Sequence, residues 1–181
     1  MAGILKVDKY QDFNGNDIMT SDGAGNITVN AAALKNTPAF SAYLSSSQTV
    51  TNNVYTKIIF NSEIVDTNSA YDTSTGRFTV PSGQGGKYMV YHNILADAST
   101  SFSYALTKTY KNGSDAAVNY NHNTIQPEAG VGYQFNVNSS VIWDLSAGDY
   151  LEVYLRFVGS GTLIANATYG CVFGAYKIIG A

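Results

Sequence analysis

The residues of this chain that could do chemistry are two histidines, one cysteine and thirteen acidic side chains. A Ser–His–Asp triad can assemble from distant positions, but with so many Ser, Thr and Asp residues no particular set is indicated as a triad. No nucleophile-elbow motif is present. No His pair, Cys pair or Asp-x-Asp-x-Asp loop offers metal-ligand spacing. Glycoside cleavage needs two carboxylates that face one bond, and no such pair is marked. The sequence therefore predicts a protein that is not an enzyme and uses no metal or cofactor, with a polysaccharide-degrading enzyme as the remaining catalytic alternative.

The histidines and the cysteine have simple structural interpretations. His92 lies in "KYMVYHNIL" and shares the face of an alternating strand with Tyr88 and Ile94, which is typical of a core histidine with its hydrogen bonds satisfied. His122 lies in the polar stretch "NYNHN", which favours a solvated or contact side chain. Cys171 has no partner for a disulfide and is expected to act as a small buried hydrophobe.

Composition excludes several classes of partner. A net charge of −3 gives no basic footprint for nucleic acid. No run approaches the roughly 18 apolar residues of a membrane span, and the first ten residues lack the apolar region of a secretion signal. The fourteen tyrosines suit strands and contact surfaces, because each ring is apolar with a polar tip.

The elements that would position any site are strands. In "YLEVYLRFV" (150–158) apolar and polar residues alternate with period two, as in a half-buried antiparallel strand. Asn112-Gly113 favours a tight hairpin turn. The sequence therefore predicts an all-β sandwich or jelly roll. Similar runs are 39–44, 54–66, 77–80, 87–95, 102–111, 116–121, 133–145 and 171–179.

The first 37 residues differ from the rest. They contain turn-prone glycines among short apolar pairs and cannot bury enough surface to fold alone. Residues 31–35 ("AAALK") predict at most one helical turn, which ends before Pro38. We therefore expect a short irregular N-terminal anchoring segment (1–37) and a head (38–181), with the segment docked on a partner or intertwined with copies of itself.

The stretch "YDTSTGRFTV" (71–80) predicts a corner followed by a strand. Asp72 favours the turn because its short polar side chain bonds nearby backbone, and Gly76 is expected to have a positive φ. Phe78 would face the core, whereas Arg77 would face solvent.

This stretch carries a family resemblance. "YDTSTGRFTVPSGQGGKYMVYHNI" resembles the signature of the complement component-one-q globular heads, a branch of the tumour-necrosis-factor-like jelly rolls. "PAFSAYL", "YALTKTYKNG", "LSAGDYLEVYL" and "FGAYKII" follow in the family's order, although the closing strand departs from its pattern with "CVFGA". The resemblance implies a jelly-roll sandwich of about ten antiparallel strands and a homotrimer whose strands meet at a threefold axis. Val172, in the last strand, is the residue we select for an axial contact.

The N-terminal segment is similar to the leaders of short structural proteins of tailed phages, especially marine ones. That resemblance implies a virion protein made in the host cytoplasm, attached through residues 1–37 to other virion proteins. We expect a trimeric tail-fibre or adaptor knob that recognises a host surface glycan or protein, with a capsid decoration or head-spike protein as the alternative. For the host contact we select the loop "NYNHNT" (119–124), with Tyr120 and His122 as its adaptable groups.

Overall fold

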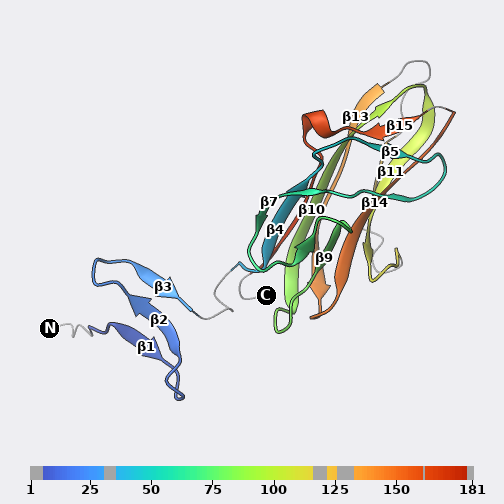
Figure 1. Ribbon diagram of the computed structural model, residues 1–181. Coiled ribbons are helices and arrows are strands. Elements are labelled where there is room, and N and C mark those ends of the chain that lie inside the picture. Colours follow the sequence, from blue (N-terminus) through green and yellow to red (C-terminus); the bar gives the residue numbers. More distant parts are fainter. Residues whose placement is uncertain (1–5, 31–35, 116–121, 126–132, 161, 179–181) are drawn as a thin grey trace.

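The computed structural model describes residues 6–30, 36–115, 122–125, 133–160 and 162–178. Their regular structure is almost entirely antiparallel β-sheet, in three separate sheets (Figure 1). The one helical element among these residues is a single 3-10 turn, η2 (Ala167–Tyr169), which starts at the N-cap side chain of Asn166. The all-β prediction is confirmed.

The N-terminal segment forms a small meander of its own. Its strands β1 (Lys9–Gln11), β2 (Asp17–Ser21) and β3 (Ile27–Val29) pair only in the order β1-β2-β3. None of the described side chains of this segment is buried, so the prediction that it builds no core agrees with the structure. It is nevertheless more regular than the irregular segment that the sequence indicated.

The regularity comes from one turn design used twice, ten residues apart. Asp12 accepts hydrogen bonds from the backbone N–H of Asn14 and Asn16 at 2.9 Å each, and also from the Asn16 amide. Asp22 binds the backbone of Ala24 and Asn26 in the same way, and the Asn26 amide as well. These local bonds fix both hairpin turns, so short strands can form without a core behind them.

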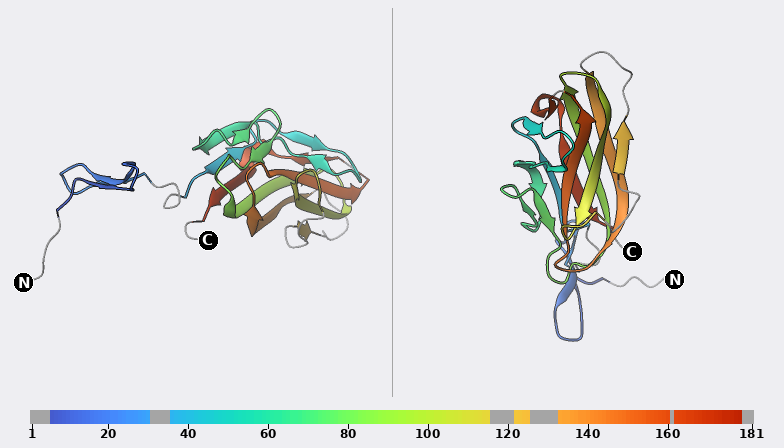
Figure 2. Two further views of the ribbon diagram at one scale, coloured as in Figure 1. Left: turned by 90° about the horizontal axis from the view of Figure 1, so that it is seen from below. Right: turned by 90° about the vertical axis from the view of Figure 1, so that its right-hand side faces the viewer.

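The head is a sandwich of two sheets (Figure 2). The first sheet, sheet I, has the order β5-β15-β10-β16-β4-β7, with β13 on the other edge of β10. Sheet II has the order β12-β11-β14-β9-β8, with β6 also paired to β14. The strands of sheet I are β4 (Ala39–Tyr43), β5 (Gln48–Val50), β7 (Ser62–Asp66), β10 (Gly86–Ala98), β13 (Tyr133–Leu145), β15 (Leu163–Ala165) and β16 (Val172–Lys177). Those of sheet II are β6 (Thr56–Lys57), β8 (Tyr71–Asp72), β9 (Arg77–Thr79), β11 (Phe102–Lys111), β12 (His122–Ile125) and β14 (Tyr150–Gly159).

Aromatic rings join the two sheets. Phe40 of sheet I stacks on Tyr71 and Phe78 of sheet II with ring centroids 4.8 and 4.7 Å apart. It also meets Phe173 edge-on at 4.9 Å. All four rings are buried, so this cluster holds the sandwich closed at the end where the predicted corner lies.

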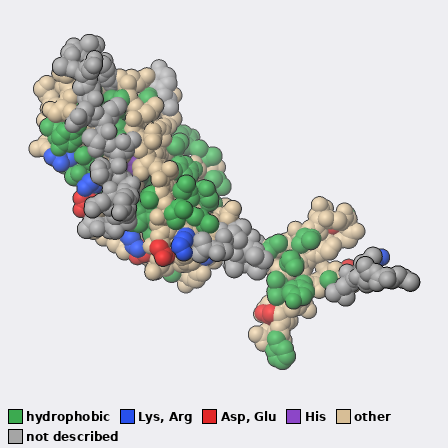
Figure 3. Space-filling view, turned by 180° about the vertical axis from the view of Figure 1, so that it is seen from behind, with side chains coloured by type: hydrophobic (Ala, Val, Ile, Leu, Met, Phe, Trp, Pro, Cys, Tyr) green, Lys and Arg blue, Asp and Glu red, His purple; other side chains and the backbone are tan. Residues whose placement is uncertain are grey.

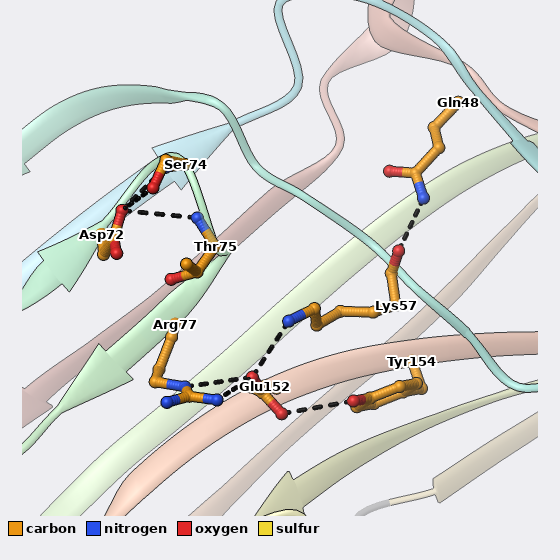
Figure 4. A network of polar contacts seen from close by, with 8 residues as sticks. All are labelled: Gln48, Lys57, Asp72, Ser74, Thr75, Arg77, Glu152 and Tyr154. Carbon is orange, nitrogen blue, oxygen red and sulfur yellow. Dashed lines mark hydrogen bonds and ion pairs between the residues drawn. The ribbon is translucent and has the colours of Figure 1, made fainter.

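The corner itself is built as the sequence predicts, with one exception. Gly76 has a φ of 68°, and Asp72 accepts bonds from the backbone of Ser74 and Thr75 (Figure 4). The exception is Arg77, which does not point freely into solvent. Its guanidinium binds a buried carboxylate, described below, because the pairing of β9 with β14 places Arg77 directly opposite that acid.

The predicted strands agree with the structure at most positions. Strand β13 has the predicted bounds, and Asn112-Gly113 forms the tight turn with φ values of 54° and 76°. The long run 54–66 is instead two strands, β6 and β7, because the intervening Ile58 and Phe60 turn into the core. The helical turn at 31–35 and the strand at 116–121 lie outside the described residues.

Candidate functional site

The outer face of sheet I presents several apolar side chains, among them Val172 and Tyr176 of β16. The core residue Phe173 points inward, so Val172 and Tyr176 point outward from β16. Val172 pairs with Tyr43 of β4 on one side and with Asn93 of β10 on the other.

A second row crosses the same face four residues further along β16. Tyr176 pairs with Met89 of β10, and Met89 pairs with Ile142 of β13. Ile142 is 57% exposed and Tyr176 is 40% exposed, although both side chains are large and apolar. Figure 3 shows that hydrophobic side chains form patches on the surface of the head.

Between these rows Tyr91 lies directly over a glycine. A Cβ built on Gly174 would come within 2.4 Å of the Tyr91 ring, so the glycine leaves the space that this ring occupies. The result is an uncharged surface across four strands on which apolar and polar side chains are mixed. Its polar members are Ser41, Asn93, Asn138 and Ser140. Such a face is costly to leave in water, and it is suited to self-association.

Sheet II has a polar outer face organised by a buried acid. Glu152 is 3% exposed and accepts hydrogen bonds from Lys57 at 3.1 Å and from Arg77 at 3.0 and 3.1 Å (Figure 4). The hydroxyl of Tyr154 donates to its other oxygen at 3.2 Å. Burial raises the pKa of Glu152, but the bonds from the two cations outweigh it and hold the pKa below its usual value. This acid is therefore a neutralised structural anion and not a proton donor.

The predicted core histidine is confirmed. His92 is 2% exposed, and its two ring nitrogens lie 2.8 Å from the Thr107 hydroxyl and 3.3 Å from the Thr109 hydroxyl. Burial lowers the pKa of His92 to about 4, so the ring is neutral at pH 7. Cys171 is also buried as predicted, and burial raises the pKa of its thiol. Neither group is available for catalysis at the surface.

The predicted contact loop meets the structure only in part. Tyr120 lies outside the described residues. His122 begins strand β12, so its backbone is not in a loop but pairs with Lys108 of β11. The register of sheet II explains the difference, because β12 adds to the free edge of β11. Within the described residues no three His, Cys, Asp or Glu side chains come together as a metal site, and no helix has the length and apolarity to cross a membrane.

Sequence comparison identifies two kinds of relative. The C1q domain family matches residues 39–178, which is nearly the whole head. An uncharacterized Bacillus subtilis (strain 168) protein, YqcC, is 30% identical over 111 residues, which make up 60% of this chain. The match spans only 30% of that protein's length.

Solved structures share the fold of the head. The globular domain of zebrafish complement 1qA aligns with a TM-score of 0.53 and 17% identity, over 78% of this chain and 97% of that one. Murine APRIL aligns with a TM-score of 0.57 and 12% identity over 77% and 98%, and the Eiger TNF of S. frugiperda with 0.58 and 15% over 79% and 93%. At these identities the likeness concerns the fold alone. The chain belongs to the C1q domain family, and its head has the jelly-roll sandwich that the sequence predicted.

Proposed function

We propose that this chain is a non-enzymatic, homotrimeric head of a virion tail fibre or adaptor, attached through residues 1–37 and directed at the host surface. The observation that carries the trimer in this proposal is the uncharged outer face of sheet I, which exposes Val172, Tyr176 and Ile142. Domains of the C1q and tumour-necrosis-factor type commonly trimerise, and this family is typically non-enzymatic. Three copies that bury this face against one another would remove its exposed tyrosines and aliphatic side chains from water.

The N-terminal segment supports attachment to a partner. Its sheet presents Tyr10, Met19 and Val29 in one cross-strand row, and Ile27 shares their face. A pocket of about 100 Å³ lies beside this row and is lined in part by Val7. Because the segment has formed strands but no core, its apolar face gains most by packing on another protein surface.

Placing a charge in the outer face of sheet I tests the trimer. Val172→Glu should convert the trimer into monomers at micromolar concentration, because an unpaired charge in a buried interface costs about 3–5 kcal/mol. Sedimentation velocity of the full chain measures the change. Val54→Glu is the matched control, since Val54 is an exposed valine outside this face and should leave the trimer intact. A monomeric wild-type chain, or a trimer that survives Val172→Glu, would contradict the proposed interface.

Deleting the N-terminal segment tests attachment. A chain that begins at Pro38 should still trimerise but should be missing from purified virions, because it lacks the apolar row of the small sheet. Complementation of a virus that lacks the gene, followed by a quantitative immunoblot of virions, measures incorporation. Normal incorporation of the shortened chain would show that residues 1–37 are not the anchor.

A capsid decoration or head-spike protein is the second candidate, since the same trimer and anchor would serve it equally well. Electron microscopy of virions with a label on this chain separates the two, because the label would mark either the tail or the capsid. A polysaccharide-degrading enzyme is the third candidate. The described head offers it little support, because its buried acid Glu152 is held by two cations. Release of reducing ends from a surface polysaccharide would favour the enzyme.

A further inference from the structure

The outer face of sheet II carries a cluster of tyrosine rings that no core requires. Tyr110 of β11 and Tyr154 of β14 stack with ring centroids 4.1 Å apart. Tyr55, which precedes β6, lies 6.0 Å from Tyr110. All three side chains are half-buried, so ring surface remains accessible to a ligand. Burial, with the charge of Glu152 nearby, raises the pKa of Tyr154 to about 12, so this hydroxyl stays protonated at neutral pH.

Cations lie around these rings. The Lys108 ammonium and the Arg156 guanidinium each lie 5.3 Å from the centre of the Tyr55 ring. Arg156 also lies 5.9 Å from the Tyr104 ring centre, and its one hydrogen bond within the described residues goes to the Asn53 side chain. No carboxylate in the described part of the chain pairs with this guanidinium.

The charge balance of this face is opposite to that of the whole chain. Four cations lie on it (Lys57, Arg77, Lys108 and Arg156), against three acids: Glu152 and Asp115, which pair with them, and Asp72, which is in register with Arg77. The described side chains of this face therefore carry an excess of one positive charge on a protein whose net charge is −3. The excess lies beside the tyrosine cluster, so an anionic ligand would be attracted to it.

We propose that this face, defined by Tyr55, Tyr110, Tyr154, Lys108 and Arg156, binds an acidic glycan through its carboxylate groups and sugar rings. The inference rests on the proposed function and gives the chemistry of the surface that the head would recognise. A sugar ring packs its C–H face on a tyrosine ring, whose face is electron-rich. Arg156 would donate two parallel hydrogen bonds to a carboxylate, in the paired geometry that guanidinium groups favour.

The chemistry of this face favours a glycan over a protein partner. Protein interfaces are depleted in Lys, Glu and Asp, although Tyr and Arg are enriched in them, and this face contains Lys57, Lys108 and Glu152. Here the rings carry hydroxyls and alternate with cations, whereas large exposed hydrophobes such as Ile142 and Tyr176 lie on sheet I. His122, which the sequence predicted to lie in a contact loop, begins β12 and is in register with Lys108 of this face.

Binding of defined oligosaccharides to the full-length trimer tests the proposal. The probes are acidic hexasaccharides of galacturonate, mannuronate and hyaluronan, with maltohexaose as the neutral control and monomeric galacturonate as the free anion. Isothermal titration should detect at least one acidic hexamer and not maltohexaose, and its affinity should fall as salt is raised. Binding of the monomer as tightly as the hexamer would show a simple anion site and overturn the glycan assignment.

Two variants locate the site. Arg156→Gln and Tyr55→Ala should each weaken binding of the acidic hexamer by about tenfold or more, since each removes a main contact. Lys87→Gln, which removes one exposed cation from sheet I, should leave affinity unchanged. Melting curves and sedimentation confirm that each variant remains a folded trimer. Equal binding by wild type, Arg156→Gln and Tyr55→Ala, or binding of none of the acidic hexamers, would overturn the proposal.

The proposed function can fail separately. A trimer that joins virions but ignores every acidic hexamer would leave the attachment role intact and refute the glycan face. In a pull-down, the wild-type trimer could retain a host surface protein, and Arg156→Gln could retain as much of it. That result would show that the head binds a protein and not an acidic glycan. A chain that binds acidic hexamers through Arg156 but never enters virions would support the face and refute the virion role.

Discussion

Replacing Phe40 with alanine is expected to lower the free energy of unfolding of the head by about 3–5 kcal/mol. The ring is 2% exposed and contacts three other buried rings, two in sheet II and one in its own sheet. Its loss leaves a cavity between the sheets that the short strands β8 and β9 cannot close, because their pairing fixes them against β14. Chemical denaturation at a fixed protomer concentration measures the change, since the stability of an oligomer depends on that concentration.

Phe13→Ala is the matched control for this substitution. Phe13 is fully exposed in the N-terminal segment, so the same loss of a ring should change the stability of the head by less than about 0.5 kcal/mol. If Phe40→Ala and Phe13→Ala cost the same, the aromatic cluster would not be what joins the two sheets.

Acidification is expected to destabilise the head by about 3 kcal/mol between pH 6.5 and pH 4 through His92 alone. The pKa of this histidine falls from 6.5 to about 4 on folding, because the buried ring cannot be solvated when it is charged. The unfolded chain therefore binds the proton first. The stability from neutral His92 is complete above pH 6.5 and is lost as pH falls toward 4.

The acids of the head act in a lower range of pH. Hydrogen bonds from Ser74 and Thr75 lower the pKa of Asp72 to about 2. Burial raises the pKa of Asp149, but its bonds to Lys111 and Asn112 outweigh this and lower it to about 2. Their contributions begin to be lost only at about pH 5 and below, so the range from pH 6.5 to 5 reports the titration of His92 without them.

Denaturation curves at several pH values measure the slope. His92→Leu should flatten it in this range, although the variant also removes the ring that Thr107 and Thr109 contact. His122→Gln removes the other histidine of the chain and should keep the slope of the wild type. If the pH dependence disappeared in His122→Gln and persisted in His92→Leu, His122 would be the titrating residue, and the assignment to His92 would be wrong.

The sequence by itself determined the class of fold and the direction of most side chains. Period-two alternation placed Leu151 and Phe157 in the core, and His92 among core residues, because a strand turns successive side chains to opposite faces. Gly76 and Asn112-Gly113 marked turns with positive φ, since few other residues adopt that conformation at low cost. These properties are local, and a single sequence carries them.

The sequence also misjudged one local feature. The N-terminal segment was expected to be irregular because it has too few apolar residues for a core. Its strands form nevertheless, because Asp12 and Asp22 fix the turns through bonds to Asn16 and Asn26 four residues later. The repeated Asp-x-x-Gly-Asn pattern was the available signal, and it is legible without a structure.

Only the tertiary structure decided which outward-facing residues become neighbours. Alternation predicts that the side chains of Glu152 and Arg77 point away from the core. It does not predict that Glu152 binds Arg77, 75 residues away in the sequence, and Lys57, 95 residues away. In the same way Tyr55 joins Tyr110 only through the pairing of β6 and β11 with the two edges of β14. The register between distant strands depends on the packing of the whole core, so the surfaces that it assembles cannot be derived from the spacing of residues along the chain.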